Sequence, residues 1–240
     1  MSAARPRDIS EFPLMRAAMV VYWFVLIDLL VVLAALPGAV LMLSLAPDAT
    51  NLPLFALSLV PFGPAVGAAV FAWRSFLRER SPSPAREFWR GYRMNVVDVL
   101  KFWVPLLALL TVLGVNLANL AAAGVPPAFG AVMVVIAVML ALWGLHMMVI
   151  TSLFSFRLRD AARLAAHVMG ARFKVTLAHL SLLVVTIGLV GYISDWVLML
   201  VASVLTFLLV WYSMPVITMV QARFVTPAGD EPDPAGPPSG

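Results

Sequence analysis

The chain has 240 residues, of which 62% are hydrophobic and 12% are charged, and its formal net charge is +4. Soluble domains carry about 25% charged residues, so this composition excludes an ordinary soluble fold and predicts a membrane protein. Cysteine is absent, which excludes disulfides, thiol catalysis and cysteine-ligated zinc. The basic residues cluster between apolar runs, as topology signals do, so we expect no nucleic acid partner.

The apolar runs predict an all-α, polytopic membrane helical bundle, because each is close to the roughly 20 residues that cross a bilayer. Six spans are expected, at residues 16–45, 53–76, 96–121, 127–156, 173–193 and 196–221. Together they form one membrane domain, residues 16–221. Residues 1–15 are expected to be a cytoplasmic segment, and residues 222–240 a disordered, acidic tail rich in proline and glycine.

The distribution of arginine and lysine predicts the orientation of these spans. Basic residues occur at the N-terminus, in the connectors around residues 74–93 and 157–174, and at Arg223. The remaining connectors carry only Asp48 and Asp195. The positive-inside rule therefore places both termini in the cytoplasm of a bacterial cell, with the spans in the inner membrane.

The first span contains a carboxylate near the middle of the membrane. Asp28 lies about 18 Å of helix beyond Arg16, where a charge is costly. We consider either an ion or proton site, or a structural carboxylate that is protonated or paired with Lys101. Further along, Pro37 and Gly38 are expected to end or kink the helix.

The second span is interrupted by Pro61, Gly63 and Pro64. These residues favour a bend within the membrane, and irregular backbone is tolerated there where it is buried in protein or lines a cavity. This helix break is therefore our candidate for a cavity. Gly63 and Gly67 also form a small-xxx-small pair, which favours close helix packing within the bundle over a dimer contact.

The connector that follows predicts an amphipathic helix on the cytoplasmic face. Ser83 is placed as its N-cap and Pro84 as its first residue. Its aromatic and basic side chains, with the asparagine after them, form a candidate docking surface for anionic lipid headgroups or a protein partner. These residues are Arg86, Phe88, Trp89, Arg90, Tyr92, Arg93 and Asn95. A second amphipathic helix is expected at residues 157–172.

Polar residues also occur inside the later spans. Asp98 and Lys101 are three residues apart at the start of the third span, so they are expected to pair. With Asp28 they form our candidate intramembrane polar site. His146 and His179 could relay protons or bind a metal, or could be neutral histidines hydrogen-bonded between helices, which we favour because no further ligand has metal-site spacing.

The order of these features resembles the YesL family of bacterial membrane proteins, also known as the domain of unknown function 624 family. The matching segments are LIDLLVVLAALPG (26–38), VPFGPAVGAAVFAWR (60–74), FWRGYRMN (88–95), LKFWVP (100–105) and, more loosely, RDAARLAAHVMGARFKVTL (159–177). The family tends to have Asn where this chain has Asp28. The resemblance implies an association with carbohydrate-utilisation genes and sugar ABC importers.

Two functions are compatible with these observations. The first is a non-enzymatic accessory or assembly partner of a membrane complex such as a carbohydrate ABC importer, with permease subunits as partners. The second is a small transporter or channel that uses a cavity at the Pro61–Pro64 break. We expect no enzyme, because the sequence lacks a nucleophile–base pair and a metal-ligand set at recognisable spacing, and we assign no cofactor. A second copy of the chain remains an alternative partner.

Overall fold

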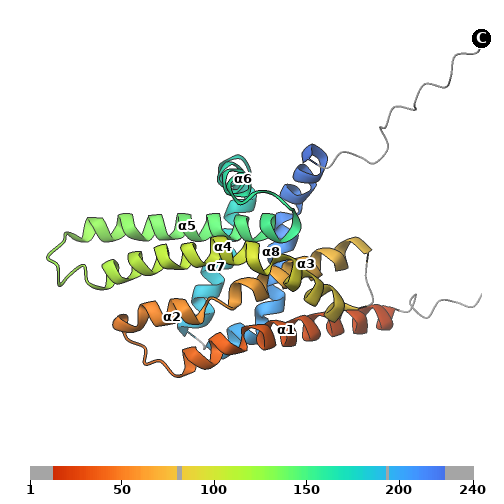
Figure 1. Ribbon diagram of the computed structural model, residues 1–240, viewed down its shortest axis with the longest axis horizontal. Coiled ribbons are helices and arrows are strands. Elements are labelled where there is room, and N and C mark those ends of the chain that lie inside the picture. Colours follow the sequence, from red (N-terminus) through yellow and green to blue (C-terminus); the bar gives the residue numbers. More distant parts are fainter. Residues whose placement is uncertain (1–12, 80–82, 193–194, 225–240) are drawn as a thin grey trace, which may run out of the picture.

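The computed structural model describes residues 13–79, 83–192 and 195–224 (Figure 1). This part of the chain contains eight α-helices and one short 3-10 helix, η2, and no strand. The elements are α1 (Pro13–Leu43), η2 (Ala49–Asn51), α2 (Leu52–Ser58), α3 (Phe62–Glu79), α4 (Pro84–Ala118), α5 (Pro127–Leu153), α6 (Leu158–Ala171), α7 (Phe173–Tyr192) and α8 (Asp195–Phe224). The expected N-terminal segment and acidic tail fall largely outside the described residues.

The described helices confirm the expected membrane bundle. Five are long and apolar enough to cross a membrane, and α2 with α3 supplies a sixth span if this pair, bent by 43°, counts as one. The helix break at Pro61–Pro64 is the source of this bend, as the sequence predicts. The chain is thus a multi-pass membrane protein by helix length and hydropathy.

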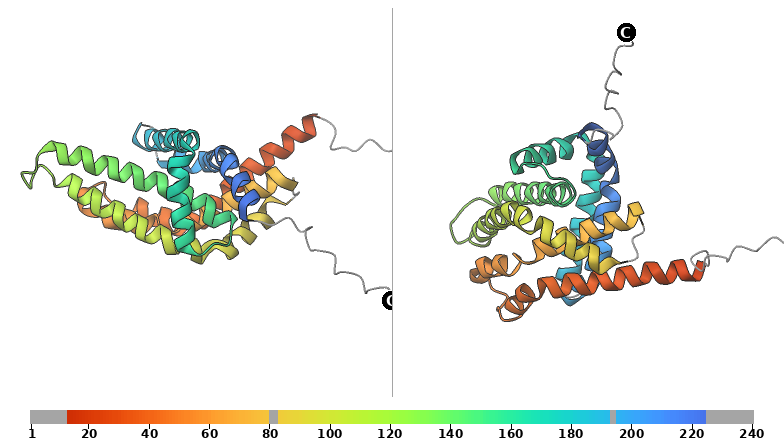
Figure 2. Two further views of the ribbon diagram at one scale, coloured as in Figure 1. Left: turned by 90° about the horizontal axis from the view of Figure 1, so that it is seen from above. Right: turned by 45° about the vertical axis from the view of Figure 1, so that its right-hand side comes forward.

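The helices form one group of near-parallel elements and a hairpin that crosses it. Helices α1, α3, α4 and α5 lie alongside one another, whereas α7 and α8 cross them steeply (Figures 1 and 2). The N-terminal end of α1, the C-terminal end of α3 and the start of α4 lie at the same end of the group. The loops at residues 44–48 and 119–126 lie at the opposite end. We call these the basic end and the far end.

Of the two outcomes expected at Pro37 and Gly38, an end or a kink of the helix, the structure excludes the end. Helix α1 continues through Pro37 to Leu43. One proline removes one backbone donor, and a membrane helix tolerates this loss where neighbouring elements support it. Here α1 lies directly against the end of α2: a Cβ atom on Gly38 would overlap the carbonyl oxygen of Ser58. The glycine permits this contact.

The first amphipathic segment is not a separate interfacial helix. It forms the beginning of α4, a continuous helix of 35 residues with a length of about 52 Å. That length exceeds the roughly 30 Å hydrocarbon core, so the helix extends past it at the basic end. Pro84 is the first residue, as expected, but the Ser83 side chain makes no capping hydrogen bond. The second amphipathic segment is the separate helix α6.

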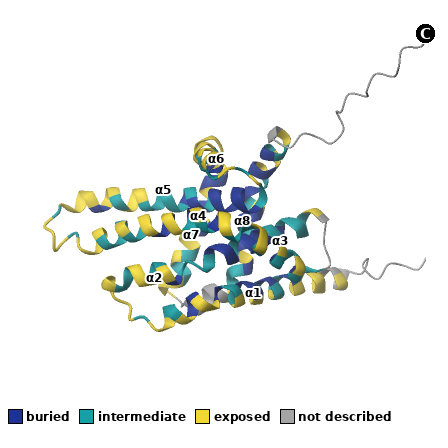
Figure 3. Cartoon of the chain, in the orientation of Figure 1, coloured by how far each residue is buried: buried dark blue, intermediate teal, exposed yellow. Residues whose placement is uncertain are grey.

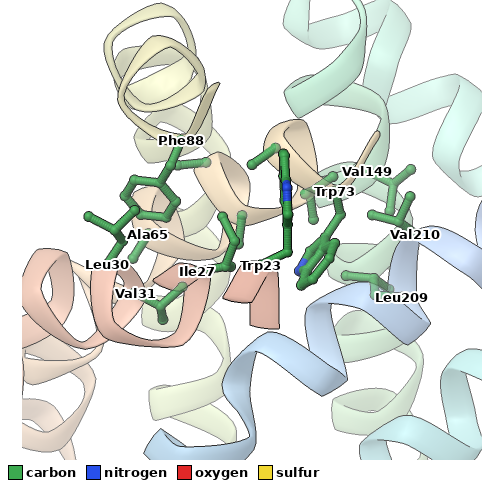
Figure 4. Packing of buried hydrophobic residues seen from close by; sticks show 14 of the residues in the cluster. Trp23, Ile27, Leu30, Val31, Ala65, Trp73, Phe88, Val149, Leu209 and Val210 are labelled. Carbon is green, nitrogen blue, oxygen red and sulfur yellow. The ribbon is translucent and has the colours of Figure 1, made fainter. Parts of the chain in front are cut away.

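The main core lies where α1, α3 and α8 meet the first turns of α4. Its largest members, Trp23, Trp73 and Phe88, are each 0% exposed (Figure 4). The Trp73 ring lies 5.9 Å from Trp23 and 5.0 Å from Phe207, measured between centroids. Burial falls off along α4 and α5 toward the far end, where most residues are exposed (Figure 3). The basic end is thus the packed end.

Candidate functional site

The basic residues of the predicted docking surface lie where the sequence places them. Arg86, Arg90 and Arg93 are all exposed on the first three turns of α4. Together with half-buried Trp89 and exposed Met94, they border a groove along one side of this helix. We call it the α4 groove. It combines an apolar floor with guanidinium groups at its edges.

Phe88 does not belong to this surface, and its assignment to a docking role is wrong. The side chain is 0% exposed and packs in the main core (Figure 4). Trp89 and Tyr92 are half-buried and pack at the edge of the core. Their rings lie 5.5 Å apart in an edge-to-face arrangement, which favours a rigid orientation. The aromatic residues therefore attach the start of α4 to the bundle, leaving the arginines outside.

Asn95 also has a structural contact rather than a free surface position. Its side-chain amide donates a hydrogen bond of 2.9 Å to the backbone oxygen of Ser152. Ser152 lies in the last turn of α5, where carbonyl groups have no partner within the helix. Asn95 thus caps the end of α5 from α4. The sequence predicts Asn95 in the docking surface and does not predict this partner.

The helix break is closed by a residue that sequence reasoning did not single out. The indole N–H of Trp103 donates a hydrogen bond of 2.9 Å to the carbonyl oxygen of Leu59, between α2 and α3. A Cβ atom on Gly63 would overlap the Trp103 ring, so glycine lets the ring lie flat against the start of α3. No local sequence pattern predicts this role, because Leu59 lies 44 residues before Trp103 in the chain.

A cavity of about 290 Å³ adjoins the break, as the sequence predicts. Leu59, Phe62 and Val66 line it from the break, and residues of α1, α5, α7 and α8 complete the wall. The lining is apolar apart from Trp103, Thr186 and Thr206. Each of these donates its hydrogen to a backbone carbonyl. The cavity therefore suits hydrocarbon better than an ion or a sugar.

The predicted polar site is not assembled as one group. Asp98 and Lys101 form the expected pair, at 2.7 Å, with both side chains more than half exposed. Asp28 instead accepts a hydrogen bond of 3.0 Å from the backbone N–H of Ser203 in α8. The structure thus forms the Asp98–Lys101 pair and no Asp28–Lys101 pair. None of the three residues lines the cavity at the break.

The two histidines meet in the interior of the bundle. Their ring centroids are 4.5 Å apart, and both side chains are buried. His146 Nε2 lies 3.2 Å from Thr176 Oγ1, and His179 Nε2 lies 2.9 Å from Ser213 Oγ. These contacts link α5, α7 and α8, as expected for histidines that hydrogen-bond between helices. The described residues contain no group of three or more metal-ligating side chains.

Comparison with protein families gives a match to the N-terminal part of the chain. Residues 17–117 match the family described as "Protein of unknown function, DUF624". This region contains the helix break, the α4 groove, Asn95 and Trp103. Searches among curated proteins and among solved structures gave no match. The chain is a multi-span membrane protein that carries a DUF624 family domain over residues 17–117.

Proposed function

We propose that the chain is a non-enzymatic accessory or assembly partner of a membrane complex such as a carbohydrate ABC importer, in the bacterial inner membrane. The observation that supports this role is the α4 groove. It presents Arg86, Arg93 and Met94 as exposed side chains beside half-buried Trp89. Tryptophan, arginine and methionine are the residue types enriched at protein interfaces.

The chemistry of the groove defines the partner surface. Its guanidinium groups attract carboxylates and form bidentate hydrogen bonds with them, and Trp89 and Met94 offer apolar contact. An acidic, amphipathic segment on the cytoplasmic side of a permease subunit would complement this pattern. Trp89 is held by its contact with Tyr92, so binding costs little side-chain ordering at the centre of the groove.

The transporter alternative finds less support in the geometry. A cavity does adjoin the helix break, but its polar lining groups already bond to backbone carbonyls. A site for an ion or a sugar requires free polar groups at the cavity wall. A transport role at this cavity would therefore be restricted to apolar cargo, and we favour the accessory role.

Affinity isolation of the tagged protein from native membranes in mild detergent tests this proposal. We expect importer permease subunits in a stoichiometric amount with the unsubstituted chain. The double variant Arg86→Gln and Arg93→Gln should lose them while still inserting into the membrane, because both residues are exposed and outside the core.

The matched control is the double variant Arg74→Gln and Arg78→Gln, which removes the same charge outside the α4 groove. It should retain the partner. Retention of the permease subunits by the Arg86/Arg93 variant would contradict the proposed docking surface. Recovery of a homo-oligomer alone from the unsubstituted chain would contradict the accessory role itself.

A further inference from the structure

A second cavity at the basic end contains a cluster of three arginines, of which Arg90 also borders the α4 groove. It has a volume of about 230 Å³ and lies where the end of α3 meets the start of α4 and the ends of α5 and α8. Arg74 and Arg78 line it from α3, and Arg90 lines it from α4. A water molecule occupies about 30 Å³ in the liquid, so this space holds a group several times larger.

The fold directs these three side chains into one space. Arg74 and Arg78 are four residues apart, and hence neighbours on the same face of α3. Arg90 reaches the cavity across Phe71, with its guanidinium carbon 6.0 Å from the centre of that ring. The arginines are therefore positioned by two packed helices and by an aromatic contact; Arg74 is half-buried, and Arg78 and Arg90 are exposed.

The charges of the described residues that line this cavity do not balance one another. Glu87 is the single carboxylate in its lining, so three guanidinium groups and one carboxylate leave two positive charges. The one ion pair among the described side chains joins Asp98 and Lys101, so none of these arginines has a carboxylate at ion-pair distance there. Arg74 is half-buried, and its hydrogen-bond partners among the described residues are neutral: Gln221 Oε1 at 3.0 Å and Met214 Sδ at 3.4 Å.

We propose that the cavity formed by Arg74, Arg78 and Arg90 binds a phosphate group. Three guanidinium groups that face one space match the oxygens of a phosphate, with which arginine forms paired, charge-assisted hydrogen bonds. The cavity lies at an end of the membrane-spanning helices, the level of lipid phosphates, and borders the basic connector. The phosphate belongs to an anionic phospholipid headgroup or to a soluble phosphorylated molecule, and the cavity shares Arg90 with the α4 groove.

Two binding measurements on the purified full chain test the site and distinguish its sources. Phosphatidylglycerol is titrated against the protein in detergent and detected by native mass spectrometry, with phosphatidylcholine as the zwitterionic comparison. Inorganic phosphate is titrated against the protein in phosphatidylcholine nanodiscs and measured by equilibrium dialysis. Saturable binding of phosphatidylglycerol assigns the site to a lipid headgroup, and saturable binding of inorganic phosphate assigns it to a soluble ligand.

The double variant Arg74→Gln and Arg78→Gln should weaken the observed binding by about tenfold or more, since each lost charged contact is among the stronger hydrogen bonds. The control Arg86→Gln and Arg93→Gln removes the same charge from the α4 groove and should change affinity less than about twofold. Arg78→Gln alone leaves the bonds of Arg74 to α8 intact and should weaken binding in a fully folded protein.

Equal weakening in the two double variants would overturn the proposal, because it would show general attraction to a basic surface. Absence of saturable binding of both probes to the unsubstituted chain would also overturn it. In the partner isolation, Arg86→Gln with Arg93→Gln is the test variant, and Arg74→Gln with Arg78→Gln is the control. Failure of the phosphate site is therefore seen in the binding measurements, and failure of the accessory role is seen in the partner isolation.

Discussion

The half of the α4–α5 pair toward the far end (the outer half) carries no charged residue, whereas the half toward the basic end (the inner half) carries six. The two halves also differ in what covers them. All buried residues of α4 lie between Pro84 and Leu107, and those of α5, apart from Gly130, lie between Leu142 and Ser152. The halves toward the far end expose side chains such as Val112 and Phe129 (Figure 3). Lipid can solvate such side chains, so their exposure carries no penalty in a membrane.

This difference shows what holds the bundle together. Hydrophobicity does not select the packed half, because the more apolar outer half is the less buried one. The packed half is distinguished by close approach at Gly63 and by side-chain donors to backbone carbonyls, from Asn95 and Trp103. Helix association in lipid relies on such small residues and hydrogen bonds. In the outer half, Gly130 permits a close approach to Leu120. The described polar side chains of α4 and its C-cap there, however, bond to carbonyls of their own helix; these are Thr111, Asn116 and Asn119.

The largest expected effect comes from adding one methyl group at the helix break. Gly63→Ala places a Cβ atom into the Trp103 ring, which is rigid and hydrogen-bonded to Leu59. Overpacking and the loss of this bond should lower the free energy of unfolding by about 3 kcal/mol. Gly114→Ala is the matched change in the outer half, where the nearest atom is Leu52 Cδ1 at 3.6 Å.

Unfolding in mixed detergent micelles, followed by circular dichroism, measures both variants. Gly114→Ala should be neutral or slightly stabilising, because alanine is the better helix former. Equal destabilisation of the two variants would show that the halves do not differ in packing as described.

A smaller effect is expected at the contact between α4 and the end of α5. Asn95→Ala removes the donor to the Ser152 carbonyl and leaves that group unpaired, which should cost about 1–2 kcal/mol. Asn116→Ala is the control, because Asn116 bonds the carbonyl of Val112 in its own helix and is exposed. We expect it to cost less than about 0.5 kcal/mol. The same micelle unfolding compares them, and an equal cost at both positions would remove the distinction between the halves.

Sequence reasoning succeeded where a single residue type determines the local structure. The apolar runs located the spans because helix length must match bilayer thickness. The break followed from Pro61, Gly63 and Pro64, since proline and glycine act on the backbone itself. The Asp98–Lys101 pair followed from helical spacing, which brings residues three apart together.

Sequence reasoning failed where the outcome depends on a partner from another helix. The basic neighbours of Phe88 predict an aromatic residue at the membrane interface, yet the core formed with α1 and α3 buries this side chain. The bonds of Trp103 to Leu59 and of Asn95 to Ser152 span distances in sequence that no local pattern encodes. The contact between His146 and His179 likewise requires the crossing of α5, α7 and α8.

The loop at the far end should give the smallest effect, because its polar contacts are exposed to water. The Asp48 carboxylate accepts hydrogen bonds from the Thr50 N–H at 2.7 Å and the Thr50 hydroxyl at 2.8 Å. These bonds favour the charged form and hold the pKa of Asp48 below its ordinary value of 3.8. The folded state therefore gains stability from them above that value, and this gain is lost as the pH falls through the lowered pKa.

Asp48→Asn keeps an acceptor oxygen at this position but removes the titration. The difference in unfolding temperature between the unsubstituted chain and this variant should be small near neutral pH and should shrink as the pH falls from about 5 to about 2. Every other titrating group is common to both proteins, so its effect cancels in the comparison. A difference that stays constant over this range would mean that the Asp48 charge contributes nothing, and that the far-end loop is held by its backbone turn and by the Asn51 amide bonded to Ala46.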